Sequence, residues 1–187
     1  IPKTVESIGS YAFYNCSGLK QLNSDIDGLF NIPKAVTTIN EYTFYNCSLA
    51  TGFTIGEITS IGTYAFSGCS LVEYFNSETQ YKIEVPNTVT SIGSYAFNGM
   101  ALITEVNVED SVESIGNGAF KGCNSIEKIT LPFVGNTLNG TSNTHFGYIF
   151  GANSYSYQYI YVPSSLEEVI ITGGTNIGFN AFYECYS

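Results

Sequence analysis

Apolar positions along this chain recur in one fixed pattern rather than with the period of a single helix or strand. The segment SIGSYAFYNC at 7–16 returns five times, with copies that begin at residues 38, 60, 91, 114 and 176. Each copy has an isoleucine, a phenylalanine five residues later and, in all but one, a cysteine three residues after that. Because repeats of about 20–50 residues bury their apolar face only against neighbouring copies, this pattern predicts a repeat solenoid.

The spacing between the phenylalanines gives the length of one coil. The steps are 31, 22, 31 and 23 residues through Phe13, Phe44, Phe66, Phe97 and Phe120, and then 62 residues to Phe182. The unit is therefore 22–23 residues, and the two longer steps carry insertions around Asn23–Asn31 and Asn76–Glu84, which we expect to be surface loops. The last step contains one degenerate coil, because 126–131 and 166–171 both predict strands whereas 133–165 lacks the pattern.

The conserved spacing assigns a role to each column of the repeat. The glycine or asparagine after each isoleucine predicts a tight corner with positive φ (Gly9, Asn40, Gly62, Gly93, Gly116 and Gly178). The six phenylalanines are expected to point inward and stack at about 4.8 Å, which is the spacing of parallel strands. A second inward column precedes the corner (Val5, Val36, Ile58, Val89 and Val112), and an apolar residue followed by proline marks the end of the preceding strand.

This unit resembles the BspA-type leucine-rich repeat, which reads roughly L-x-x-I-x-I-P-x-x-V-x-x-I-G-x-x-A-F-x-x-C, over about residues 1–131 and 166–187. Three positions depart from it: Met100 replaces a cysteine, Thr43 an alanine and Gly174 a valine. The resemblance implies an α/β-type repeat solenoid, in which a right-handed leucine-rich-repeat coil combines short parallel strands with turns or short helical segments. It also implies a surface or secreted protein of the kind found in anaerobic bacteria and some parasitic protozoa, several of which are linked to adhesion.

Composition restricts the partners of the chain. We expect 1–187 to be a single repeat array with an irregular island at 133–165, and a segment of a longer protein. Six basic residues face 16 acidic ones, for a formal charge of −10. This balance disfavours nucleic acid and anionic membranes, because phosphate binding requires clustered cations. No run of 18 apolar residues exists, so we expect no membrane insertion by this segment.

The residues that usually carry chemistry do not form a recognisable site. All five cysteines fall in the repeat column occupied by Met100, which favours packing over disulfide, redox or metal chemistry. The only histidine, His145, has no nucleophile motif near it in sequence, so it predicts no catalytic centre. The run Asn23-x-Asp25-x-Asp27-Gly28 resembles half of a calcium loop, but Lys34 stands where the closing acid belongs. We expect no catalytic residues, no metal site and no cofactor.

Tyrosines are the more suggestive residues. Tyr11, Tyr42, Tyr64 and Tyr95 occupy one column, which predicts a packed ladder with solvated hydroxyls. Four more tyrosines alternate with other residues inside the island, so in an extended conformation they would share one face. They could form a contact surface or could pack inward over a wide coil. The candidate partner-binding residues are Tyr155, Tyr157, Tyr159, Tyr161 and, in the second insertion, Tyr81.

The pattern as a whole favours a protein that binds rather than one that catalyses. Our leading interpretation is a surface-exposed repeat module that mediates adhesion to an extracellular protein or glycan of a host or neighbouring cell. The alternative is a passive stalk or spacer of a larger surface protein. An enzyme built around His145 is the least supported interpretation.

Overall fold

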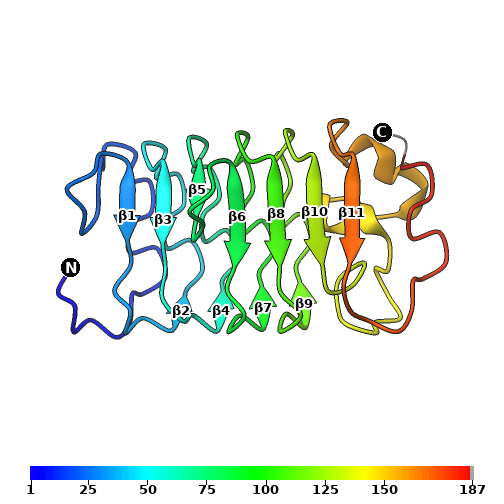
Figure 1. Cartoon of the computed structure of the whole chain (residues 1–187), viewed down its shortest axis with the longest axis horizontal. Coiled ribbons are helices and arrows are strands. Elements are labelled where there is room, and N and C mark those ends of the chain that lie inside the picture. The colour runs from blue at the N-terminus through cyan, green and yellow to red at the C-terminus, as the bar shows by residue number, and fades with distance from the viewer. Residues whose placement is uncertain (186–187) are drawn as a thin grey trace.

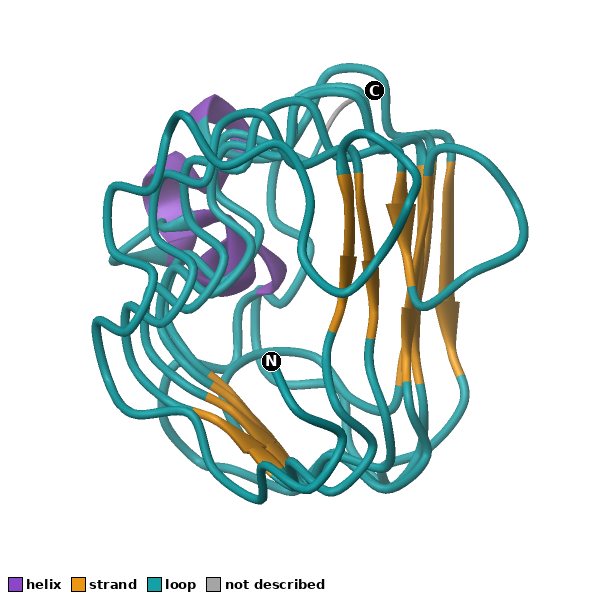
Figure 2. Cartoon of the chain, turned by 90° about the vertical axis from the view of Figure 1, so that its left-hand side faces the viewer, coloured by secondary structure: helices purple, strands orange, loops and turns teal. Residues whose placement is uncertain are grey.

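The computed structural model describes residues 1–185 as an elongated coil with one parallel sheet on each of two sides (Figures 1 and 2). In the described part of the chain, the wider sheet has the order β1-β3-β5-β6-β8-β10-β11 and the narrower one β2-β4-β7-β9. The wide sheet contains β1 (Leu29–Asn31), β3 (Gly52–Thr54), β5 (Tyr74–Phe75), β6 (Lys82–Val85), β8 (Glu105–Val108), β10 (Lys128–Leu131) and β11 (Glu168–Ile171). The narrow sheet contains β2 (Thr38–Ile39), β4 (Ser60–Ile61), β7 (Ser91–Ile92) and β9 (Ser114–Ile115).

Two short 3-10 helices, η1 (Phe146–Phe150) and η2 (Tyr155–Ile160), lie on the side of the coil away from the wide sheet. Figure 2 shows these helices above the narrow sheet. The helices and the narrow sheet thus face the wide sheet across the coil. No helix among residues 1–185 has the length and apolar character needed to cross a bilayer.

Every strand pairing within the two sheets is parallel, which confirms the predicted solenoid. In β1, β5, β6, β8 and β10, half-buried and buried residues alternate. The buried side chains of the wide sheet face the core, and these are at most 1 % exposed: Phe30, Phe53, Phe75, Ile83, Val106 and Ile129. The isoleucines of the repeat lie in the strands of the narrow sheet. The sequence pattern predicted only a corner after each isoleucine and not this second sheet. The second inward column is also confirmed, since all its members after Val5 are fully buried.

The aromatic spine forms, but it is shorter and looser than predicted. The rings of Phe13, Phe44, Phe66, Phe97 and Phe120 stack within 8° of parallel, with centroids 5.2–5.9 Å apart. The sixth ring does not continue this column, because the island inserts η1 between Phe120 and Phe182. Phe182 instead contacts Phe146 at 5.0 Å and remains 37 % exposed.

The two insertions are more than the surface loops that their lengths predicted. Each forms a six-residue loop, 23–28 or 76–81, and then returns to the wide sheet as an extra strand. Phe30 therefore pairs with Leu22, and Ile83 with Phe75, each only eight residues along the chain. Parallel pairs usually need a crossover of a dozen residues or more. The short return works because each loop begins and ends with a left-handed residue: Asn23 and Gly28 in one, Asn76 and Tyr81 in the other.

The second extra strand lies beside the widest step of the spine. The first does not widen its step, since Phe13 and Phe44, which flank that insertion, are the closest pair at 5.2 Å. The ring of Phe75 lies 4.9 Å from both Phe66 and Phe97, nearly perpendicular to each. Phe66 and Phe97 are accordingly the most widely spaced pair of the spine, at 5.9 Å. Edge-to-face contacts of this kind are favourable for aromatic rings.

The prediction of positive φ at the glycine column is wrong. The left-handed residues lie two positions later, where Tyr11, Tyr42, Tyr64 and Tyr95 have φ of 54–61°. The glycines serve a different purpose, since a Cβ on Gly62 or Gly116 would lie 2.3–2.6 Å from the backbone of the preceding coil. At these two positions only glycine permits the coils to approach this closely, whereas between the first two coils Asn40 fills the column and donates to the Ile8 carbonyl.

The island at 133–165 does contain the predicted degenerate coil. β10 and β11 pair directly, with Ile129 opposite Val169, so the strand side of the coil is regular. On the other side, η1 replaces the usual turn, and the Phe120 backbone N–H donates to the carbonyl of Ile149 at 2.9 Å. The irregular sequence is therefore accommodated on one side of the coil only.

Candidate functional site

The helix η2 is held in place by one buried glutamine. The Gln158 side chain is fully buried, and its Oε1 accepts a hydrogen bond from the Gly147 backbone N–H at 2.8 Å. Its Nε2 donates to the carbonyl oxygens of Asn180 and Tyr183 at 3.2 and 2.9 Å. A single side chain thereby joins η2 to η1 and to the last described coil, so the outer side chains of η2 stand on a fixed support.

The four tyrosines of the island do not form an extended strand. They lie in and immediately after η2, so the expectation of a single extended face is wrong. The alternative that they pack inward is also wrong, because Tyr157 and Tyr159 are 63 % and 47 % exposed, and Tyr155 and Tyr161 are both 38 % exposed. The alternation of polar and aromatic residues here belongs to a 3-10 helix and not to a strand. Ser154 caps this helix, because its hydroxyl accepts a hydrogen bond from the Ser156 backbone N–H.

The exposed aromatic surface extends from η2 onto the last described coil. Tyr155 makes edge-on ring contacts with Phe179 at 6.2 Å and with Tyr183 at 6.0 Å. Phe179 is 82 % exposed. We call this the η2 surface, and it comprises Tyr155, Tyr157, Tyr159, Ile160, Tyr161, Phe179 and Tyr183. Sequence reasoning missed Phe179, which occupies a repeat column filled by smaller or polar residues elsewhere.

Tyr81 lies apart from the η2 surface. It is the left-handed residue that ends the loop 76–81, with a φ of 63°. Its backbone carbonyl accepts hydrogen bonds from Thr104 and Glu105 at 2.8 and 3.1 Å. Tyr81 directly precedes β6, and Figure 1 shows β8 and β10 between β6 and β11, the strand that borders the helices. The structure therefore does not bring Tyr81 together with the other four candidates.

The tyrosine ladder is structural. Tyr11, Tyr42, Tyr64 and Tyr95 stack with centroids 4.8 Å apart, and the Nζ atom of Lys121 lies 5.7 Å from the last ring centre. Each inner ring thus has both faces covered, and only ring edges and hydroxyls meet solvent. The sequence held a signal for the unusual backbone here, because the column continues as Gly118 and Asn180, the residue types that best tolerate positive φ.

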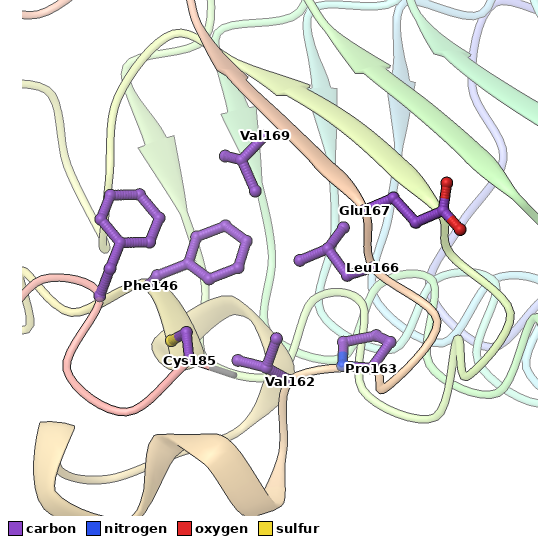
Figure 3. A pocket seen from close by; sticks show the side chains of 8 residues that line it. Phe146, Val162, Pro163, Leu166, Glu167, Val169 and Cys185 are labelled. Atoms are coloured by element: carbon purple, nitrogen blue, oxygen red, sulfur yellow. The ribbon is translucent and has the colours of Figure 1, made fainter. Parts of the chain in front are cut away.

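An apolar hollow lies behind η2 (Figure 3). Its volume is about 130 Å³, and Phe146, Val162 and Leu166 form much of its wall. Glu167 is its one charged lining residue, and Figure 3 shows this carboxylate pointing away from the apolar side chains. The hollow is part of the gap between η1 and the last coil. It brings no acid, base and nucleophile together.

The cysteine column is explained by hydrogen bonds between coils. The thiols of Cys47, Cys69 and Cys123 each donate to the carbonyl of the spine phenylalanine one coil earlier, at 3.2–3.3 Å. Burial raises the pKa of the Cys123 thiol to about 12 and that of the Cys185 thiol to about 11. All five cysteines are free thiols. A thiol held protonated in this way is a poor nucleophile, because the thiolate is the reactive form.

His145 and the acidic loop also show no catalytic or metal-binding geometry. His145 is buried, and its Nε2 lies 3.1 Å from the backbone carbonyl of Ala152, so the imidazole supports the turn after η1. In the first loop, the Ser24 hydroxyl accepts a hydrogen bond from the Ile26 backbone N–H, which makes a solvated turn. Among residues 1–185, no group of three or more His, Cys, Asp or Glu side chains is placed to hold a metal ion.

The chain is similar both to a known repeat family and to solved leucine-rich repeat structures. Residues 1–82 and 72–187 match the family described as the BspA type leucine rich repeat region, in six copies. Among solved structures, a leucine-rich repeat protein of T. pallidum matches with a TM-score of 0.52 and 19 % identity, over 78 % of this chain and 70 % of that one. No curated protein matches.

Two further structures align at lower similarity. A leucine-rich repeat protein from Bacteroides ovatus has a TM-score of 0.34 and 22 % identity, over 99 % of this chain and 63 % of that one. A leucine-rich cell surface protein from Faecalibacterium prausnitzii has a TM-score of 0.35 and 24 % identity, over 67 % of this chain and 42 % of that one. The chain thus spans less than two thirds of the length of both.

Proposed function

Because this chain belongs to the family of BspA-type leucine-rich repeat regions, we propose that it is a non-enzymatic module at the cell surface or in secreted form that mediates adhesion. Its partner is an extracellular protein or glycan of a host or a neighbouring cell. The family is typical of bacterial surface proteins, and repeat solenoids present long continuous surfaces to their partners.

The η2 surface is the observation that supports this proposal. Half of the exposed large hydrophobic side chains in residues 1–185 lie between 155 and 183, nine of eighteen. Among residues 1–185, Tyr157, Tyr159 and Tyr161 make no contact with another aromatic ring, and Tyr157 and Tyr159 are the more exposed of the island tyrosines. Tyrosine gives a large contact area at a low cost in side-chain entropy, and contiguous exposed apolar patches mark interaction sites.

The fixed support of η2 favours binding over simple coverage of a wide coil. Gln158 anchors the helix through three hydrogen bonds, so the backbone that carries the tyrosines is ordered before association and the ordering cost of binding is reduced. In the tyrosine ladder, by contrast, the ring faces are already occupied by neighbouring rings.

The decisive experiment measures binding of the isolated chain to a panel of extracellular-matrix proteins and glycans by surface plasmon resonance. We expect at least one ligand whose affinity falls tenfold or more in the double variant Tyr157→Ala and Tyr159→Ala. The matched control is Tyr11→Ala with Tyr14→Ala, which removes two exposed tyrosines from the other end of the coil. The absence of binding to every ligand would favour the passive spacer.

The enzyme interpretation has its own test. The native chain and His145→Ala are both expected to show no hydrolase activity, because the imidazole contacts the Ala152 carbonyl and the Tyr148 ring and no nucleophile. A hydrolytic activity that disappears in this variant would contradict the proposal of a non-enzymatic module.

A further inference from the structure

A furrow follows β3 along the outer face of the wide sheet. Its middle part has a volume of about 560 Å³ and is lined by Ile26, Leu29, Tyr74, Asn76 and Glu78, among others. These residues come from both insertion loops, 23–28 and 76–81, and from the strands beside β3. Figure 1 shows β1, β3 and β5 side by side at the N-terminal end of the sheet.

Two smaller hollows extend this furrow at its ends. Thr51 lines both the middle part and a hollow of about 270 Å³ that also contains Leu49 and Leu71. Asn76 lines both the middle part and a hollow of about 390 Å³ that also contains Glu57. The three parts therefore adjoin one another along residues 49–57, of which 52–54 form β3.

The strands under the furrow are uncharged, whereas the rest of the outer face carries ion pairs. The charged residues that line the furrow lie at its sides and ends: Asp27, Glu57, Glu78, Lys20 and Lys34. From β6 onward, Lys82 pairs with Glu84 and Glu105, and Lys128 pairs with Glu168. The strands β1, β3 and β5 carry no charged residue. Large aliphatic side chains are exposed there instead, since Ile26 is 63 % and Leu71 44 % exposed. Exposed aliphatic groups that line a concavity indicate a contact site for another protein.

The two loops that border the furrow carry only negative charge. Loop 23–28 contains Asp25 and Asp27, loop 76–81 contains Glu78, and neither contains lysine or arginine. All three acids are exposed. Lys20 and Lys34 line only the two end hollows, each beside an acid, Asp27 or Glu57. Complementary charge steers a partner toward a surface and suppresses like-charged ones, so the acidic loops beside the middle part favour a cationic segment there.

The backbone of β3 is not available to the partner. Both of its edges are paired, one with β1 and the other with β5, so a peptide cannot join the sheet as an added strand. The partner's amides must instead meet side chains. Within residues 1–185, the side chains of Thr51, Thr54 and Asn76 make no hydrogen bond, and all three are at least partly exposed.

We propose that this furrow binds an extended protein segment in which aliphatic side chains alternate with lysine or arginine. The aliphatic groups contact Ile26, Leu49 and Leu71, and the cations reach the carboxylates of the two loops. An oligosaccharide fits less well, because the two aromatic residues of the furrow are the half-buried Tyr74 and the buried Phe53, and the exposed apolar side chains are aliphatic. The furrow is a second contact site, separate from the η2 surface, and it does not depend on that surface.

The test uses ten-residue synthetic peptides that alternate leucine or valine with lysine, a matched series with glutamate in place of lysine, and neutral oligosaccharides. Binding to the native chain is measured by fluorescence anisotropy at two salt concentrations. We expect the lysine series to bind at least tenfold more tightly than the glutamate series, with the difference reduced at high salt. Equal binding of both series, binding of oligosaccharides only, or no binding would overturn the proposal.

Charge reversal makes the test specific to the furrow. The double variant Asp27→Lys and Glu78→Lys should reverse the preference toward the glutamate series. The control, Glu41→Lys with Glu113→Lys, changes the net charge by the same amount at exposed sites outside the furrow and should keep the native preference. An unchanged preference in the first variant would contradict the assignment.

A third variant separates this proposal from the η2 surface. Ile26→Ser with Leu71→Ser should weaken binding of the lysine peptides tenfold or more, and both side chains are exposed enough for the fold to survive. Tyr157→Ala with Tyr159→Ala should leave peptide binding unchanged. If only the tyrosine variant weakens the peptides, the furrow is not their site, whereas the proposed adhesion function would stand.

Discussion

A Cβ atom on Gly93 would lie 2.4 Å from the backbone nitrogen of Thr63, one coil earlier along the solenoid. This approach is set by backbone on both sides, so no side-chain movement can relieve it. Gly93→Ala should therefore lower the free energy of unfolding by roughly 1–3 kcal/mol, the usual range for overpacking. Urea denaturation followed by circular dichroism measures the change.

The first coil supplies the control for this prediction. Gly9 occupies the same column, but no described residue outside its own chain neighbours lies within 4 Å of its Cβ position. Gly9→Ala should leave stability within about 0.5 kcal/mol of the native value or raise it slightly. Equal destabilisation by both substitutions would show that coil contact is not the reason for the glycines.

In the tyrosine ladder, we expect a substitution by glycine to be less destabilising than one by alanine. Tyr64 has a φ of 54°, and its ring lies 4.8 Å from those of Tyr42 and Tyr95. Both Tyr64→Ala and Tyr64→Gly lose the stacking, but only glycine relieves the left-handed backbone, at about 1 kcal/mol or more. Tyr64→Gly should therefore be the more stable of the two in thermal denaturation. The reverse order would contradict the assigned backbone conformation.

The spine should be the most sensitive part of the core. Phe97 is fully buried between Phe66 and Phe120 and contacts the edge of Phe75. Phe97→Ala should cost roughly 3–5 kcal/mol in the free energy of unfolding. Phe179→Ala serves as the control, because that ring is 82 % exposed and should change stability by no more than about 0.5 kcal/mol.

The buried thiols predict a loss of stability at alkaline pH. Burial raises the pKa of Cys123 from 9.0 to about 12. The folded chain therefore keeps this proton while the unfolded chain releases it above pH 9. Stability is complete below pH 9 and is lost as pH rises toward 12, by about 1.4 kcal/mol per pH unit for each such thiol.

The variant Cys123→Met isolates this contribution, because methionine already occupies the column at Met100. Between pH 8 and 11, under reducing conditions, urea midpoints of the variant should fall less steeply than those of the native chain. Parallel curves for the two proteins would mean that Cys123 ionises equally in the folded and unfolded states.

Gln158 should be more important than its polar character suggests. Gln158→Leu leaves the buried Gly147 N–H without its acceptor, at a cost of roughly 1–3 kcal/mol, and releases η2 from the last coil. Hydrogen exchange should speed up in η2 but not in β6 or β8. Gln80→Leu is the control, since that exposed amide bonds only the Glu73 carboxylate and its loss should affect neither measurement.

The repeat could be recognised in the sequence because the same packing requirement recurs in six copies. Each coil must bury one phenylalanine and one β-branched residue against its neighbours, so the columns from Val36 and Phe44 onward identify the solenoid and its parallel strands. The cysteine column was predictable for the same reason, since Met100 at the same position indicated packing rather than chemistry.

The backbone at individual positions was less predictable. A glycine satisfies both positive φ and close approach, and nothing in the sequence separates the two, so the role of Gly62 was assigned wrongly. Likewise, an insertion of eight or nine residues predicts a loop. Only the pairing of Leu22 with Phe30 reveals that it also adds a strand.

The sequence by itself determined the coil, its period and its inward columns, because local spacing fixes which side chains can share a core. Tertiary structure decided which surfaces remain open. The η2 tyrosines are exposed because Gln158 anchors their helix from a distance of 22 and 25 residues, and the furrow on β3 exists because two separated loops border the same strand. Contacts between distant segments create both surfaces, and no local pattern encodes them.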